Sequence, residues 1–137
     1  MVNKISPWII DKLSNNKNEF FIDEITDNKE GLTVKVSDNK GLKVEIVWSH
    51  EKLVSYRNTN ESYFLFGLGQ LTERLQLRKN FYIIQNSEYV KFIEEWGNPE
   101  TIDITSELIH FAIYTSEDCL DIIATYNPII KVGNVLN

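Results

Sequence analysis

The segment from residue 42 to residue 49 constrains the fold more than any other part of this chain. Within it, Leu42, Val44, Ile46 and Trp48 alternate with Lys43, Glu45, Val47 and Ser49. Successive side chains of a β-strand point to opposite faces of the sheet, so this alternation predicts a strand with one face on the core and one toward solvent. The chain must therefore build a sheet with at least one covered face.

Turn-forming clusters divide the region around this segment. Asp27–Gly31 and Asp38–Gly41 are rich in Asp, Asn and Lys, and each ends in glycine. Such clusters between β-rich runs are typical of hairpin turns. They predict three antiparallel strands joined as a meander. A fourth strand is expected from about residue 53 to residue 58, after a turn at residues 49–52.

Three segments carry helix signals. Ser6 and Pro7 supply a cap and a first-turn proline, which predicts a helix over residues 7–15. Asn86 and Ser87 precede apolar residues at helical spacing, namely Tyr89, Phe92, Ile93 and Trp96, and Gly97–Pro99 would end this second helix. Thr115–Asp118 resembles a capping box before a third helix, with Leu120, Ile123 and Ala124 as its apolar stripe and Pro128 after its end.

These elements together predict the fold class. Further strands are expected at residues 81–84 and 108–114, whereas residues 63–78 fit a strand or a helix equally well. We expect residues 1–137 to form one α+β domain, with an antiparallel sheet of about five to seven strands and about two to four helices packed mainly on one face.

Charge and cysteine content exclude several classes of protein. The 137 residues contain 14 basic and 20 acidic side chains, a net charge of −6, and this balance argues against nucleic-acid binding, which requires a basic surface. Cys119 is the single cysteine, so an internal disulfide is excluded. We find no run long and apolar enough for a signal peptide or a membrane span. We therefore expect a cytoplasmic protein without a membrane partner.

Motifs that carry chemistry are scarce. There is no glycine-rich phosphate loop, paired-cysteine metal motif or nucleophile elbow, so we expect no cofactor, no metal and no catalytic residue. Cys119 adjoins an apolar stripe and is interpreted as a structural cysteine of the core or its boundary. His110 lies between Ile109 and Phe111, so we expect its side chain either to face the partly solvated side of the sheet or to be hydrogen-bonded in the core. Arg57 and Glu61 are predicted to form a structural ion pair that fixes the turn between them.

The acidic residues are concentrated in one part of the sequence. From Glu88 to Asp121 there are nine acidic residues and one basic residue, Lys91, a net charge of −8. These acids either complement helix N-termini and solvate exposed faces, or form a docking surface that steers a basic protein partner. The candidate partner-binding residues are Glu88, Glu94, Glu95, Glu100, Asp103, Glu117, Asp118 and Asp121. Tyr89, Trp96 and Tyr126 lie in the same region and are candidate anchors of an interface.

Several segments after residue 50 carry a resemblance. They are Val54–Arg57 with Glu61–Tyr63, Phe81–Tyr89, Ile109–Tyr114 and Asp121–Pro128. In these segments the chain resembles small proteins of Gram-positive bacteria that are similar to the immunity proteins of polymorphic toxin systems. The resemblance implies one-to-one binding to a toxin domain without any chemistry of the chain's own. An acidic surface would suit a toxin that is basic where it holds nucleic acid.

Three hypotheses follow from the sequence. The leading one is an immunity-type protein that neutralises a toxin or other basic partner by covering its active site. The second is a small enzyme or ligand-binding domain with a site near Arg57, Glu61 and neighbouring tyrosines. The third is a structural subunit that forms a homo-oligomer through an exposed sheet edge.

Overall fold

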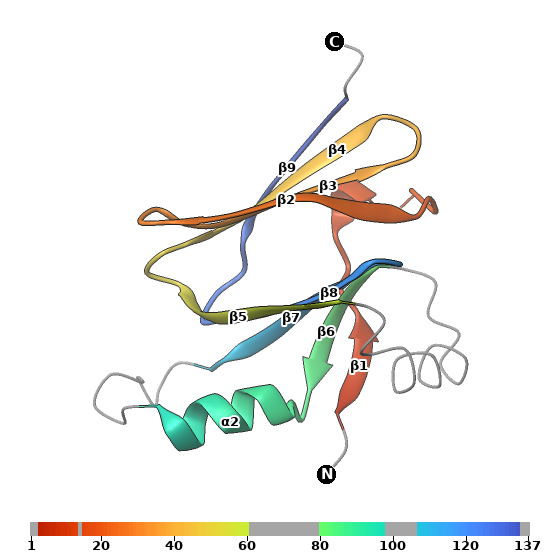
Figure 1. The fold of residues 1–137 in the computed structure, drawn as a ribbon. Helices are drawn as coiled ribbons and strands as arrows, with labels where there is room; N and C mark the ends of the chain where they lie inside the picture. The colour runs from red at the N-terminus through yellow and green to blue at the C-terminus, as the bar shows by residue number, and fades with distance from the viewer. Residues whose placement is uncertain (1–2, 14, 61–79, 98–106, 135–137) are drawn as a thin grey trace.

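Two antiparallel sheets face each other in the computed structural model, which describes residues 3–13, 15–60, 80–97 and 107–134 (Figure 1). One sheet has the strand order β1 (Lys4–Pro7), β6 (Phe81–Gln85), β7 (Ile109–Tyr114), β8 (Asp118–Ala124), β5 (Leu53–Asn60). The other has the order β2 (Phe20–Asn28), β3 (Gly31–Asp38), β4 (Leu42–Ser49), β9 (Ile129–Asn134). A short 3-10 helix, η1 (Asp11–Leu13), follows β1, and α2 (Glu88–Trp96) follows β6.

The predicted meander is confirmed as β2, β3 and β4. Strands β3 and β4 pair with Val34 opposite Ile46, and Ile46 and Trp48 are buried as the alternation predicts. Gly31 has a φ of 132°, and a Cβ placed on it would lie 2.0 Å from the Trp48 carbonyl oxygen. Only glycine fits this close approach at the start of β3. The predicted fourth strand is confirmed as β5, but it belongs to the opposite sheet.

The main core fills the space between the two sheets. Strands of both sheets contribute large apolar side chains with almost no exposed surface, such as Val34, Ile46 and Trp48 from one sheet and Phe111 and Ile122 from the other. Trp48 and Phe111 meet across the layer with their ring centroids 5.5 Å apart. This packing of two inner faces is the arrangement of a β-sandwich.

The expected α+β class is wrong. Within the described residues α2 is the one α-helix, and it lies against the outer face of the five-stranded sheet, away from the four-stranded sheet (Figure 1). The fold is an all-β sandwich with one helix on its outside. Two of the three predicted helices account for the error.

The predicted helix over residues 7–15 is replaced by β1 and η1. Ser6 and Pro7 pair with Ile83 and Tyr82 of β6, and the Trp8 amide donates to the Phe81 carbonyl oxygen at 2.9 Å. Proline lacks an N–H and is tolerated at an edge strand, where one side of the backbone has no strand partner. Pairing with a distant strand thus overrides the local helix signal at Ser6 and Pro7.

The predicted third helix is strand β8. Thr115 does accept backbone hydrogen bonds, from the amides of Glu117 at 3.2 Å and Asp118 at 3.0 Å, but its own amide donates to the Asp118 carbonyl oxygen at 2.7 Å. These bonds close a hairpin turn between β7 and β8 instead of starting a helix. Because β8 is covered on both faces, its sequence is a continuous apolar run that cannot be told from a buried helix by periodicity.

The remaining elements match the sequence expectations where the structure describes them. The strands predicted at residues 81–84 and 108–114 are β6 and β7, and the middle helix is α2 with Ser87 as its N-cap. The Gly97 amide donates to the Ile93 carbonyl oxygen at 2.7 Å at the end of this helix. The ambiguous residues 63–78 lie outside the described residues.

Candidate functional site

The outer face of the five-stranded sheet is buried and polar where α2 covers it. In β8, Leu120 and Ile122 point into the core between the sheets, and Cys119, Asp121 and Ile123 point to the outer face. Cys119 is buried, as predicted for a structural cysteine, and Asp121 is 0% exposed. A carboxylate in this position needs hydrogen-bond donors around it.

Three side chains lie within hydrogen-bond distance of Asp121. Its Oδ1 lies 2.7 Å from His110 Nε2 and 2.5 Å from the Tyr114 hydroxyl, and its Oδ2 lies 3.2 Å from Arg57 Nε. Arg57 and Tyr114 donate to the carboxylate, and the His110 ring nitrogen lies within hydrogen-bond distance of it. Arg57 and Asp121 are also direct partners in the register of β5 and β8. The four side chains link three strands of the sheet.

Ser87 extends these contacts into the helix. Its Oγ lies 2.6 Å from His110 Nδ1 and accepts the Val90 amide at 3.0 Å, which caps the first turn of α2. Asn86, just before it, has a φ of 54°, a left-handed conformation that asparagine tolerates better than most residues. This residue redirects the chain from β6 into α2. The chain of contacts Asp121–His110–Ser87 therefore joins the sheet to the helix cap; we call these three residues with Arg57 and Tyr114 the Asp121 network.

Tyr89 is the side chain of α2 that is buried against the sheet. Its hydroxyl lies 2.6 Å from Ser55 Oγ of β5, and its ring stands edge-on to His110 with centroids 5.7 Å apart. The Arg57 guanidinium lies over the same ring, 4.2 Å from its centroid. Such cation–π contacts stabilise a cation and an aromatic ring against each other. Tyr89 therefore holds α2 against the Asp121 network at a second point.

Two tyrosines on this face, Tyr114 and Tyr82, have a raised pKa. Burial raises the pKa of Tyr114, and the neighbouring Asp121 carboxylate raises it further. Burial alone raises the pKa of Tyr82 to about 12. Tyr82 packs with Tyr114, Ile84 and Ala112 in a small apolar cluster on the same face. The neutral phenols are thus required for this face to pack as it does.

The order serine, imidazole, carboxylate is also that of hydrolytic enzymes, in which the base takes the proton of a serine nucleophile. Here Ser87 and His110 are 5% and 2% exposed, and the Ser87 hydroxyl oxygen accepts an amide of the helix it caps. A substrate carbonyl has to reach such an oxygen directly. We therefore assign the Asp121 network to holding α2 in place. Among the described residues there is no cluster of three or more side chains that would hold a metal ion.

Two aromatic residues of α2 that follow Tyr89 at helical spacing are exposed. Phe92 is 55% exposed and Trp96 is 78% exposed, with their ring centroids 6.1 Å apart. Of the candidate anchors in this helix, Trp96 is therefore exposed and Tyr89 is buried. Glu94 and Glu95 are exposed too, and Glu95 lies three residues after Phe92, next to the aromatic pair. We call Phe92, Glu94, Glu95 and Trp96 the α2 surface.

The acidic residues of α2 are placed unfavourably for the helix itself. Glu94 and Glu95 lie in its last turn, which contains no basic residue. The C-terminal end of a helix carries a partial negative charge, so carboxylates there cost roughly 0.3–1 kcal/mol each. Helix complementation therefore explains Glu88, in the first turn, but not Glu94 or Glu95.

Three other candidate partner residues, Glu117, Asp118 and Asp121, lie away from this surface. Glu117 is exposed and Asp118 half-buried in the β7–β8 turn, at the opposite end of β7 from His110. Asp121 was expected on the docking surface, but it is buried beneath α2 and cannot touch a partner. Glu100 and Asp103 lie outside the described residues.

The predicted ion pair between Arg57 and Glu61 falls partly outside the described residues, because Glu61 is not among them. Within the described residues Arg57 contacts Asp121, 64 positions away along the chain. The interpretation of His110 as a hydrogen-bonded core residue is confirmed. The connection of His110 to Asp121, Tyr114 and Ser87 was missed, and the signal available was a lone aspartate inside the apolar run of residues 119–124.

Comparisons with protein families, with curated proteins and with solved structures find no match to this chain. In the part of the chain that the structure describes, the helices are too short or too polar to cross a membrane. The function is therefore inferred from the geometry of α2 and of the sheet beneath it.

Proposed function

We propose that this chain is a cytoplasmic protein-binding module of the immunity type, which uses the α2 surface to cover the active site of a basic protein such as a toxin domain. The observation that carries the proposal is the exposure of Trp96 and Phe92 side by side on a helix that is fixed at its N-cap and at Tyr89. Tryptophan and other aromatic residues dominate the binding energy of many protein interfaces.

The charges on α2 support a basic partner. Glu95 lies next to the aromatic pair, three residues after Phe92, and Glu94 and Glu95 both lie at the helix end where negative charge is unfavourable. A positively charged partner would relieve this repulsion and would also be steered toward the helix during encounter. The fixed position of α2 lowers the entropy cost of binding, because the helix does not have to be ordered on contact.

The test is a binding titration on an identified partner. The full chain is used to capture partners from lysate of the source cell and from its neighbouring gene products, and the captured protein is then purified and titrated by calorimetry. We expect one-to-one binding that weakens as salt is raised. Trp96→Ala should weaken it by about 30-fold or more, as expected for an interface hot spot.

Matched variants make the result decisive. Ile129→Ala removes an equally exposed apolar side chain from β9, and Glu51→Lys reverses an exposed charge far from α2 in sequence. Both should leave affinity unchanged, whereas Glu94→Lys with Glu95→Lys should slow association. Unchanged binding by the α2 variants would remove this function from the α2 surface, and binding without loss of the partner's activity would remove the immunity role.

A further inference from the structure

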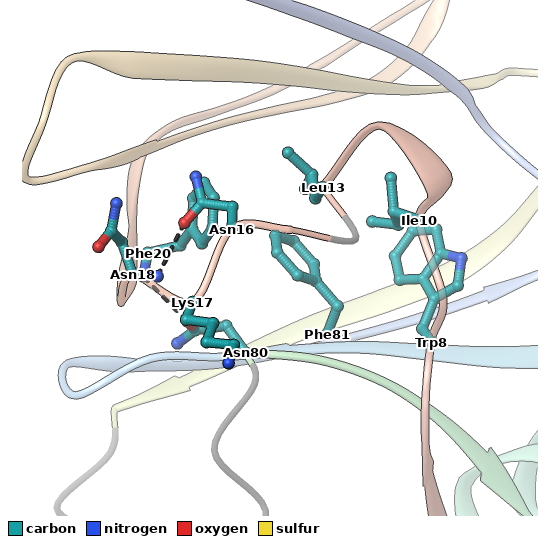
Figure 2. A pocket seen from close by; sticks show the side chains of 9 residues that line it. All are labelled: Trp8, Ile10, Leu13, Asn16, Lys17, Asn18, Phe20, Asn80 and Phe81. Atoms are coloured by element: carbon teal, nitrogen blue, oxygen red, sulfur yellow. Dashed lines mark hydrogen bonds between the residues drawn. The ribbon is translucent and has the colours of Figure 1, made fainter.

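A pocket of about 360 Å³ opens between the two sheets, well away from α2 (Figure 2). Its walls are apolar and come from Trp8, Ile10, Leu13, Phe20 and Phe81. Its rim is polar and comes from Asn16, Lys17, Asn18 and Asn80. Segments from β1, η1, β2 and β6 therefore meet around one concave site, which the proposed protein-binding function does not use.

The walls have the geometry that aromatic rings prefer. Phe20 and Phe81 stand edge to face, with centroids 5.4 Å apart and an interplanar angle of 63°. Trp8 and Phe81 do the same at 6.0 Å and 84°. Edge-to-face contacts of this kind add to the stability gained from apolar burial alone. A planar ring that enters the pocket would meet aromatic edges and faces on more than one side.

The rim is held in place by its own hydrogen bonds. Asn80 accepts the Phe20 amide at 2.9 Å and donates to the Tyr114 carbonyl oxygen at 2.8 Å. Asn16 and Asn18 donate from their side-chain amides to Asp38 Oδ2 at 3.0 and 3.1 Å. The side chains at the mouth are therefore positioned before anything binds. A primary amide has two N–H groups, so Asn16 and Asn18 can each donate a second hydrogen bond.

The size of the pocket limits the ligand. A cavity of roughly 150 Å³ accommodates one benzene ring, and ligand sites generally begin near about 300 Å³. The space of about 360 Å³ therefore suits two fused rings. The apolar walls disfavour a charge on the buried part of the ligand, because burying an unpaired charge is costly.

We propose that this pocket binds a small, neutral, bicyclic aromatic molecule, with its rings between Trp8, Phe20 and Phe81 and one polar group facing the rim amides. The α2 surface lies on the outer face of the five-stranded sheet, away from this pocket. The proposal for the pocket can therefore be tested independently of the proposed protein-binding function. Binding here would occur with the partner site of α2 free or occupied.

Indole is the probe for the test, followed by NMR of the full chain. We expect saturable shifts of the Trp8 indole N–H and of the side-chain amides of Asn16, Asn18 and Asn80, with a Kd on the order of 0.1–1 mM. Cyclohexanol should bind at least about fivefold more weakly, because it lacks the ring electrons that the aromatic walls contact. Equal binding of cyclohexanol, tighter binding of indole-3-acetate, or no saturable shift with indole would overturn the proposal.

Variants locate the bound probe. Trp8→Leu removes one wall and should weaken indole binding about fivefold. Asn18→Phe fills the mouth from the rim without changing the core and should weaken it about tenfold. Ile9→Ala alters an exposed neighbour that does not line the pocket and should leave binding unchanged. Indole binding that survives both Trp8→Leu and Asn18→Phe would place the probe elsewhere and refute the assigned site.

Discussion

The two faces of the five-stranded sheet are both buried, yet different forces bury them. The inner face packs against the second sheet through apolar side chains such as Phe111, Leu120 and Ile122. The outer face holds Asp121 and His110 under α2, with each polar group satisfied by a neighbour. Adjacent residues of a single strand, Leu120 and Asp121, therefore serve an apolar core on one side and a hydrogen-bonded contact on the other.

This difference shows how hydrogen bonds can fix one helix against a sheet in addition to apolar packing. Tyr89 is the buried residue of α2, so shape alone does not determine where the helix lies. Hydrogen bonds have directional geometry, and a fully satisfied buried network specifies one arrangement. The inner core supplies most of the stability of the sandwich, and the Asp121 network supplies the position of α2.

The largest expected effect comes from Asp121→Ala. The variant leaves the buried His110 ring and the part-buried Tyr114 hydroxyl without their acceptor, at a cost of roughly 1–3 kcal/mol for each, whereas the half-exposed Arg57 can be solvated. Its matched control is Leu120→Ala, which removes an apolar side chain on the opposite face at a cost of roughly 2–5 kcal/mol. Urea unfolding measures both costs. Near-neutral stability of Asp121→Ala would contradict the role given to the network.

Ser87→Ala is expected to have a smaller effect. It removes the cap of α2 and one hydrogen-bond partner of His110, with a combined cost of roughly 1–3 kcal/mol. Circular dichroism and thermal unfolding measure the loss of helix and of stability. Ser116→Ala, at an exposed position in the β7–β8 turn, should change neither. If Ser87→Ala and Ser116→Ala changed helix content and stability equally, Ser87 would have no role in the Asp121 network.

Alkaline pH should weaken the outer face first. Burial raises the pKa of Tyr82 to about 12, so its neutral form is favoured in the folded protein. An unfolded tyrosine ionises near about pH 10, so this stability is complete below pH 10 and is lost as pH rises toward 12. Tyr82→Phe should reduce the fall in unfolding free energy over that window by roughly 1–3 kcal/mol. An unchanged pH profile in the variant would contradict the assignment.

The smallest effect is expected at Asp38, at the end of the inner core. Burial raises the pKa of Asp38, but hydrogen bonds from Asn16, Asn18 and the amides of Leu42 and Lys40 outweigh it and bring the pKa to about 2. The lowered pKa stabilises the fold above about pH 4, and this contribution disappears as pH falls toward 2. Asp38→Asn should therefore be less stable than the native protein at pH 6 and nearly equal at pH 2. A difference in unfolding free energy between Asp38→Asn and the native protein that stays constant with pH would contradict this prediction.

The sequence predicts the inner face better than the outer one, for a physical reason. Alternation in residues 42–49 and the glycine-ended turns determine which side of each strand is covered, and the meander follows from them. Residues 119–124 are covered on both sides, so their apolar run was read as a helix. The Arg57–Asp121 contact joins residues 64 positions apart, and no local pattern encodes such a pairing.

The exposure of α2 could be predicted only in part. Ser87 as a cap and the helix after it follow from local signals, and both are confirmed. Whether Phe92 and Trp96 face a core or solvent depends on what packs against the helix, which is a property of the whole fold. Two large aromatic residues at core spacing on a helix with acidic residues at its C-terminal end are the sequence pattern that accompanies the proposed contact surface.

Hydrogen exchange of Asp121→Ala compared with Leu120→Ala tests the central claim most directly, because it reports on each element separately. The account predicts that Asp121→Ala removes amide protection from α2 under conditions where β3 and β4 remain protected. Leu120→Ala should lower protection in both sheets and in α2 together. Retained protection of α2 in Asp121→Ala, or a uniform loss across both variants, would contradict the conclusion that the buried Asp121 network holds this helix in place.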